Sequence, residues 1–352
     1  MKRHLLLVSA VLLSVIAWGQ KITLYMTGNQ TYECDIAQLD SIVFSEAQTN
    51  PVEEIVVTVD PSGNADGGHW FEKIDESNYY IDNLKYTIQD GDLVVSGYDE
   101  VFFTGEAKII SILNYRGRTM NVVKIGDRAF SSCSSLTSVT IPNGVTSIGD
   151  FAFNNCRSLS DASIGSGVTS IGTRAFNLCT HLTSITIPNG VTSIGSEAFQ
   201  SCYSLTSIII PNSVTSIGDS AFEGCSSLTD ISIGSGLSCI DFEVFNKCSS
   251  LTSITIPNNV SSIEGNAFKD CRGLTSVTIG YNVTCIRYHA FRGCSSLTDV
   301  YCLAPNVPEA NEGDAFAESS IASATLHVPA ASVEAYSTTE PWKNFGSIVA
   351  IE

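Results

Sequence analysis

One arrangement of apolar and polar positions recurs along the second half of the chain. In the stretch LTSVTIPNGVTSIG, Leu136, Val139 and Ile141 face one side and hydroxyl side chains the other, as a half-buried strand requires. Pro142 has no N–H with which to continue a ladder, so the strand is predicted to end there, and the Asn-Gly pair that follows predicts a turn. This stretch therefore predicts a short strand followed by a tight turn.

The chain after this turn supplies a second inward pair, Val145 and Ile148, and then Ala152 and Phe153, where we expect a short helical corner. The complete unit is 23 residues long, and three residue types keep that spacing: phenylalanine at 130, 153, 176, 199, 222, 245, 268 and 291, cysteine at 133, 156, 179, 202, 225, 248, 271 and 294, and leucine at 136, 159, 182, 205, 228, 251, 274 and 297. A unit this small cannot bury its apolar side chains alone, so successive units must stack. The repeat therefore predicts a β-solenoid whose coils lie about 4.8 Å apart.

The repeated pattern C-x-x-L-x-x-h-x-I-P-x-x-V-x-x-I-G-x-x-A-F, where h is Val, Ile or Ala, resembles the BspA-type leucine-rich repeats of bacterial surface and secreted proteins. It covers residues 122–302, and segments similar to that family's caps flank it at 79–121 and 326–352. The resemblance implies a mainly β leucine-rich-repeat solenoid with short strands and short helical or irregular corners, preceded by a small β-rich N-terminal region. It also implies a non-enzymatic protein that adheres to host matrix or cell-surface proteins.

The chain is predicted to have four parts. These are a signal peptide at 1–19, an acidic β-rich region with the N-terminal cap at 20–121, the solenoid at 122–302, and a final irregular repeat with the C-terminal cap at 303–352. A linker, AQTNPVEE, is expected at 47–54 within the second part.

The signal peptide is predicted from Lys2 and Arg3, which precede an apolar stretch at 5–17, and from small residues before Gln20. The apolar stretch is too short to cross a bilayer as a helix, and no later stretch is long enough. No cysteine follows the expected cleavage point, so we expect no lipid anchor there. We therefore expect an exported protein, either secreted or on the cell surface.

Charge narrows the choice of partners. The chain has 36 acidic residues against 18 Lys and Arg, a net charge of −18. Nucleic acids need clustered basic side chains, and anionic lipid surfaces repel an acidic protein, so we expect no nucleic-acid partner and no membrane insertion.

The twelve cysteines invite a disulfide interpretation in an exported chain. Eight of them form one column in which parallel Cβ atoms would lie about 4.8 Å apart, farther than the roughly 3.8 Å that a disulfide favours. Cys239 and Cys285 occupy one column with Ser262 between them, and Cys302 replaces a core isoleucine. We expect buried thiols that behave as small hydrophobic groups, with some bridging as the alternative. A straight column does not converge on a point as zinc ligands must.

Catalytic motifs are absent from the sequence: it has no HExxH, GxSxG, P-loop or dinucleotide fingerprint. The histidines of the mature chain, His69, His181, His289 and His327, have no motif partner, and the repeated hydroxyl residues are expected to hydrate the sheet or cap corners.

In DPSGNADGG (60–68), oxygen-bearing residues alternate as in a calcium loop, but position twelve is Phe71 rather than Glu. We expect an acidic turn, with calcium binding as the alternative, and no enzyme activity or cofactor.

The outward strand positions form the candidate ligand-binding surface. They make two columns: Ser138, Asp161, Ser184, Ser207, Asp230, Ser253, Ser276 and Asp299, and beside them Thr140, Ser163, Thr186, Ile209, Ser232, Thr255, Thr278 and Tyr301. This surface is mostly hydroxyl, and binding hot spots favour aromatic and arginine side chains, so it predicts weak or avidity-dependent binding. A solvated face whose acids oppose aggregation is the alternative.

A second candidate patch interrupts the acidic chain on the corner side. It comprises Lys269, Arg272, Arg287, Tyr288 and Arg292. The leading functional hypothesis is adhesion to, or recognition of, a protein ligand through the strand positions. A carbohydrate-binding or scaffold role within a surface complex is the alternative, although the shortage of outward aromatic residues counts against sugar stacking.

The interpretation of the cysteines is testable by thiol titration of the purified, unreduced protein in denaturant. We expect nearly all cysteines to react, because the predicted ladder forms no disulfides. Fewer than about ten free thiols would contradict the buried-thiol interpretation.

Overall fold

The computed structural model describes the backbone of residues 3–8, 12–18, 21–26, 30–35, 39–45, 71–73, 77–100, 103–115, 118–310 and 314–351. Side chains are described within 77–100, 103–113, 119–310 and 314–351. The predicted calcium loop at 60–68, His69 and the linker at 47–54 lie outside the described residues. The chain separates into two compact units, Met1–Lys85 and Tyr86–Glu352.

The described residues of the first unit form short strands. They are β1 (Arg3–Val8), β2 (Leu12–Trp18), β3 (Lys21–Met26), β4 (Gln30–Asp35), β5 (Leu39–Ser45), β6 (Phe71–Lys73) and β7 (Asn78–Ile81). β1 and β5 pair in parallel, β2, β3 and β4 form an antiparallel sheet, and β6 pairs antiparallel with β7. The predicted signal segment coincides with β1 and β2, and its role as a signal remains a prediction.

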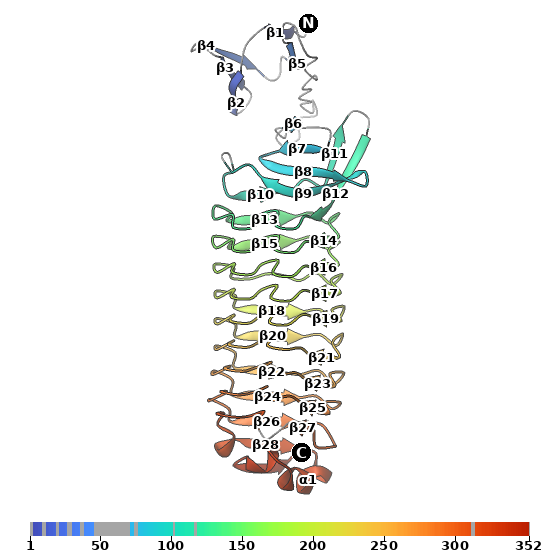
Figure 1. Ribbon diagram of the computed structural model, residues 1–352, viewed down its shortest axis with the longest axis vertical. Helices are drawn as coiled ribbons and strands as arrows, with labels where there is room; N and C mark the ends of the chain where they lie inside the picture. Colours follow the sequence, from blue (N-terminus) through green and yellow to red (C-terminus); the bar gives the residue numbers. More distant parts are fainter. Residues whose placement is uncertain are drawn as a thin grey trace. The chain divides into compact units, whose positions relative to one another are not determined.

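The second unit is a stack of coils whose strands form two columns (Figure 1). The long-strand column contains β10 (Glu106–Lys108), β13 (Ser138–Ile141), β15 (Asp161–Ile164), β18 (Ser207–Ile210), β20 (Asp230–Ile233), β22 (Ser253–Thr255), β24 (Ser276–Ile279), β26 (Asp299–Cys302), β28 (Thr325–Val328) and β29 (Ser347–Ala350). The paired strands of this column are parallel, and within the regular repeats they join residues 23 apart, such as Val139 with Ala162. The predicted solenoid is therefore confirmed.

The short-strand column closes the other side of each coil. Its members are β9 (Asp92–Tyr98), β12 (Arg118–Ile125), β14 (Ser147–Ile148), β16 (Ser170–Ile171), β17 (Ser193–Ile194), β19 (Ser216–Ile217), β21 (Cys239–Ile240), β23 (Ser262–Ile263), β25 (Cys285–Ile286) and β27 (Glu309–Ala310). β8 (Leu84–Gln89) precedes β9 through a turn at Asp90 and Gly91, and β11 (Ile112–Tyr115) forms an antiparallel hairpin with β12.

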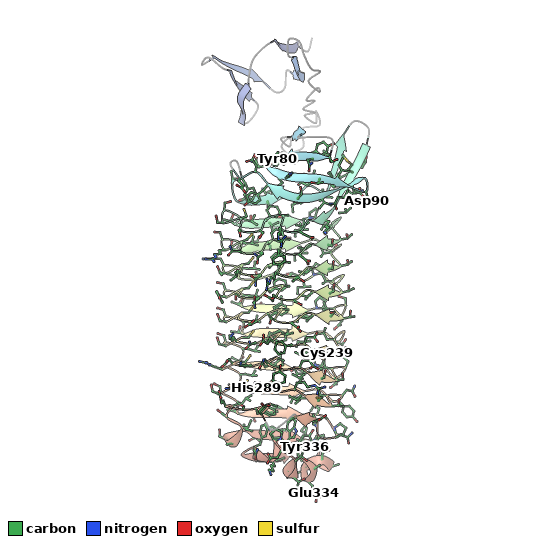
Figure 2. All side chains as sticks on the ribbon, viewed as in Figure 1. Tyr80, Asp90, Cys239, His289, Glu334 and Tyr336 are labelled. Atoms are coloured by element: carbon green, nitrogen blue, oxygen red, sulfur yellow. The ribbon has the colours of Figure 1, made fainter. Side chains whose placement is uncertain are left out.

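Matching side chains from successive coils fill the space between the two columns (Figure 2). Leu136, Val139 and Ile148, predicted to point inward, are at most 1% exposed. The eight periodic phenylalanines are fully buried and stack ring on ring, with centroids 5.0 to 5.6 Å apart between neighbours. The phenylalanine column is therefore a continuous aromatic stack along the core.

The corners that contain the phenylalanines are turns, so of the two corner types expected, helical or irregular, the structure has the irregular one. Phe153 donates its N–H to the Ala175 carbonyl of the next coil at 2.7 Å, whereas Asn154 donates to Phe151 in its own coil at 3.0 Å. A helix would direct both groups along its own axis. Alternate N–H groups of the corner donate hydrogen bonds to the neighbouring coil. This turn geometry places residues such as Phe151 (57°) and Asn155 (60°) at positive φ.

Aromatic side chains close both ends of the phenylalanine stack. Tyr98 lies parallel to Phe130 with centroids 5.9 Å apart. At the other end, Trp342 and Phe345 each meet Phe316 edge to face at 5.5 Å, within a cap built from η3 (Ile321–Ser323), η4 (Ala330–Ser332), α1 (Val333–Thr338) and η5 (Trp342–Asn344). The cap covers apolar surface that a further coil would otherwise bury.

Replacing a phenylalanine in the middle of the stack should destabilise the solenoid strongly. Phe222 is fully buried, with ring centroids 5.2 Å from Phe199 and 5.6 Å from Phe245. We expect Phe222→Ala to lower the free energy of unfolding by about 3–5 kcal/mol, measured by chemical denaturation. The control Tyr281→Ala, at a residue 55% exposed, should change it by no more than about 0.5 kcal/mol. Equal effects of the two variants would contradict the role of the stack.

Candidate binding surfaces

The outward side chains of the long strands form one surface, here called the strand face. All the strand positions predicted from the sequence point outward and are exposed or half-buried. Register pairs Ser138 with Asp161 and Thr140 with Ser163, so each predicted column is one row of side chains across parallel strands. The coil at 184–187 contributes Ser184 and Thr186 in the same orientation, although its backbone is not assigned as a strand. The strand face is therefore continuous across the repeats.

The structure extends the strand face beyond the predicted columns. Glu106 and Lys108 precede Ser138 and Thr140 in register, and Thr325 and His327 follow Asp299 and Tyr301. These residues lie outside the strict 23-residue repeat, so periodicity alone did not identify them.

Two features stand out on the hydroxyl-rich strand face. Ile209, 69% exposed, lies in the middle of the outward rows as an apolar point. Near the C-terminal end, the rings of Tyr301 and His327 stack with centroids 4.2 Å apart, and His327 lies 3.0 Å from a carboxylate oxygen of Asp299. This hydrogen bond is the main cause that lowers the pKa of the Asp299 carboxyl. A protein ligand would therefore meet an aromatic pair beside a carboxylate at this end.

Other repeated hydroxyl groups belong to the scaffold rather than to the surface chemistry. Thr169 donates its hydroxyl to the Thr146 carbonyl one coil earlier at 3.0 Å, and Thr298 donates to Thr275 at 3.1 Å. The same bond recurs along two columns, one on each side of the coil. The expectation that these residues hydrate the sheet or cap corners was incomplete, because they also link neighbouring coils through side-chain to main-chain hydrogen bonds.

The cysteines with described side chains are free, and all but the half-buried Cys239 are buried, as predicted. They also make hydrogen bonds that the sequence did not indicate. The Cys156 thiol donates to the Phe130 carbonyl at 2.9 Å, and the bond recurs at each later cysteine of the column at 3.2 to 3.3 Å. Burial raises the pKa of Cys225 and Cys271 to about 12, so these thiols stay protonated at neutral pH and are poor nucleophiles.

Acidic neighbours outside the second predicted patch offset much of its positive charge. Arg272 lies 3.4 Å from Asp270, Arg287 lies 3.7 Å from Glu264, and Arg292 lies 2.5 Å from Glu318.

The remaining members of this patch lie in different parts of the coil. Lys269 belongs to the corner, whereas the Tyr288 ring covers Gly265, where an added Cβ would come within 2.8 Å of the ring. The same ring reaches Phe242, two coils away from its own position, with centroids 6.4 Å apart. Tyr288 therefore packs along the stack although it is 47% exposed.

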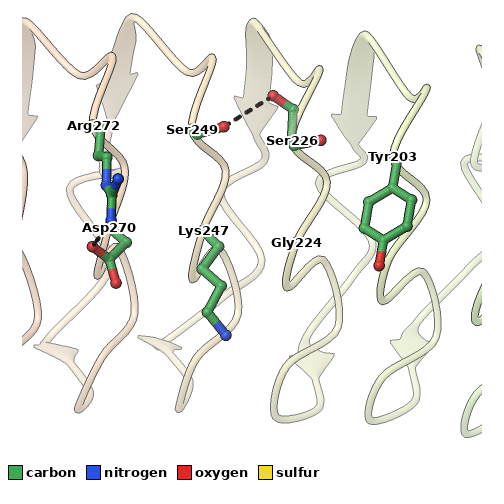
Figure 3. A pocket seen from close by; sticks show the side chains of 7 residues that line it. All are labelled: Tyr203, Gly224, Ser226, Lys247, Ser249, Asp270 and Arg272. Carbon is green, nitrogen blue, oxygen red and sulfur yellow. Dashed lines mark hydrogen bonds and ion pairs between the residues drawn. The ribbon is translucent and has the colours of Figure 1, made fainter.

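The corner side also contains a hollow. This corner groove, about 320 Å³ in volume, is lined by Tyr203, Gly224, Ser226, Lys247, Ser249, Asp270 and Arg272 (Figure 3). One column of the repeat holds Tyr203, then two serines, then Arg272, so small side chains lie between two large ones. Reading this variable column along the chain could have indicated the groove.

The fold first defines the class of protein: this is a leucine-rich-repeat β-solenoid. Residues 110–229 and 215–337, more than half of the chain, match the BspA-type leucine-rich repeat region in six copies. The chain belongs to this family, so the resemblance inferred from the repeats is confirmed. Solenoids of this class typically bind other molecules through extended surfaces rather than act as enzymes.

The chain is similar to solved leucine-rich repeat proteins. A leucine-rich repeat protein from Bacteroides ovatus is 25% identical, with a TM-score of 0.60, over 77% of this chain and 76% of that one. A leucine-rich repeat protein from T. pallidum is 26% identical over 61% of this chain and 88% of that one, with a TM-score of 0.46. Comparison with curated proteins finds no match.

The contact between Asp299 and His327 predicts a measurable titration effect. In the folded protein the pKa of Asp299 should lie below 3.8, and its contribution to stability should be present above the unfolded pKa and lost as the pH falls through the folded value. We expect His327→Phe, which keeps a ring beside Tyr301, to raise the Asp299 pKa in an NMR titration. The control His289→Phe should leave it unchanged, and an unaltered Asp299 pKa in His327→Phe would refute the assignment.

Proposed function

We propose that this chain is a non-enzymatic, exported binding protein that recognises an extracellular-matrix or cell-surface protein through the strand face. The observation that carries the proposal is the continuity of this surface, with outward rows kept in register across consecutive coils. Solenoids of this kind use such extended surfaces for binding.

The chemistry of the strand face favours a ligand that makes many modest contacts. Hydroxyl groups offer both donors and acceptors but little apolar area, so each coil contributes little binding free energy. A ligand that spans several coils binds more tightly than its separate contacts would suggest. Once the first contact has formed, each later contact forms within the same complex. The apolar Ile209 and the ring pair of Tyr301 and His327 supply the few anchors.

Carboxylates recur at a regular interval along the strand face. Asp161, Asp230 and Asp299 recur every third coil in one column, which corresponds to about 14 Å between neighbours at the spacing of parallel strands. Carboxylates at this distance are too far apart to share a metal ion. They would complement a protein segment that carries basic side chains at a similar interval, and they would steer its approach.

Export and display at the cell surface complete the proposal. They rest on the basic and apolar residues at the start of the chain and on the family to which the repeats belong. Across the described part of the chain, no helix has the length and apolar character needed to cross a bilayer. The proposed partner is therefore a protein outside the cell that produces this chain.

The strand face can be tested by reversing two of its charges. We expect the combined variant Asp161→Arg and Asp230→Arg to bind its ligand at least about tenfold more weakly, because opposed charges replace complementary ones. The measurement is surface plasmon resonance against a panel of extracellular-matrix and cell-surface proteins, with thermal melting to verify folding.

The matched control is Asp219→Arg, which makes the same charge change at an exposed residue just after the short strand β19. This variant should bind as the unaltered protein does. Undiminished binding by the double variant, or no binding to any protein of the panel, would count against the proposal.

A further inference from the structure

The corner groove lies away from the strand face and has a chemistry of its own. In the column that forms its rim, Tyr203 and Arg272 lie three repeats apart, about 14 Å at the coil spacing. Ser226 and Ser249 fill the two coils between them, and Gly224 adds no side chain in the neighbouring column. The groove therefore exists because two adjacent coils carry small residues where their neighbours carry large ones.

One end of the groove is an exposed aromatic ring. Tyr203 is 46% exposed, although large aromatic side chains in this solenoid are mostly buried. Figure 3 shows its ring beside the open space left at Gly224. Most of the groove lining consists of apolar atoms, which come from this ring and from the aliphatic parts of the long side chains. This surface suits a ligand with an apolar face.

The other end of the groove offers paired charges. Arg272 lies 3.4 Å from Asp270, and Lys247 lies 2.9 Å from Glu223. Each cation keeps donors available, because the Arg272 and Lys247 side chains remain 71% and 59% exposed, and Asp270, 30% exposed, supplies a carboxylate. The groove therefore presents hydrogen-bond donors and acceptors together with little net charge.

We propose that the corner groove binds an uncharged oligosaccharide. The apolar C–H face of one sugar ring packs against the Tyr203 ring, and hydroxyl groups of the sugars bind the donors and acceptors around Arg272. The volume of about 320 Å³ is at the lower end of the range for small-molecule sites, which fits a short segment of a glycan.

Charge favours this ligand over the alternatives. A polyanion would be repelled by a chain with a net charge of −18 and would find both cations already paired. A basic peptide would meet Lys247 and Arg272 at the groove itself. An uncharged saccharide avoids both penalties and still satisfies the polar groups.

The test uses the purified full chain on an array of neutral and acidic glycans, followed by calorimetric titration with the strongest neutral ligand. We expect Tyr203→Ala to weaken binding of the neutral glycan by about tenfold or more. Ser226→Trp, which fills the groove, should have a similar effect, and Arg272→Ala serves as a third variant at an exposed position. Thermal melting identifies any variant that fails to fold.

Tyr281→Ala is the matched control, since it removes an exposed tyrosine outside the groove. This variant, and the strand-face variant Asp161→Arg with Asp230→Arg, should bind the neutral glycan normally. Loss of glycan binding in the groove variants alone supports the proposal independently of the strand face. Binding only to acidic glycans or peptides, no binding to neutral glycans, or neutral-glycan binding unaffected by Tyr203→Ala and Arg272→Ala would overturn it.

Discussion

Each coil of this solenoid depends on its neighbours for its backbone hydrogen bonds. Along the long strands, main-chain groups pair with residues 23 positions away. In the corners, alternate N–H groups donate to carbonyls 22 positions ahead, as from Phe153 to Ala175. An insertion within one coil would leave buried polar groups without partners, which costs free energy. This requirement holds the repeat length constant and keeps the inward columns uniform.

Side chains reinforce the same alignment. Threonine hydroxyls and cysteine thiols donate to carbonyls of the preceding coil, as from Thr169 to Thr146 and from Cys156 to Phe130, and the phenylalanine rings stack in one line. Because these interactions repeat with the coil, a residue that suits one coil suits all of them. The cysteine column is therefore part of the scaffold, and its protonated, buried thiols are unsuited to redox or nucleophilic chemistry.

Residue identity can vary at the outward positions, because the side chains there do not take part in the stacking of the coils. These positions are therefore where ligand recognition can evolve. Hydroxyl groups dominate the strand face, while variation on the corner side produces a hollow between Tyr203 and Arg272. The two surfaces differ in chemistry: one is extended and acidic, and the other is small, partly aromatic and nearly neutral. A solenoid can present both because each column varies independently of the others.

The sequence by itself determined the solenoid, its inward columns and the orientation of the strand face, because a fixed period and strict alternation leave few other ways to bury Leu136, Val139 and Phe153. It could not determine the corners, since residues as different as Glu197, Ser220 and His289 share one positive-φ position there. Only the tertiary structure brought Asp299 to His327 and opened the groove beside Gly224, because these contacts depend on side-chain directions between coils, which no local pattern encodes.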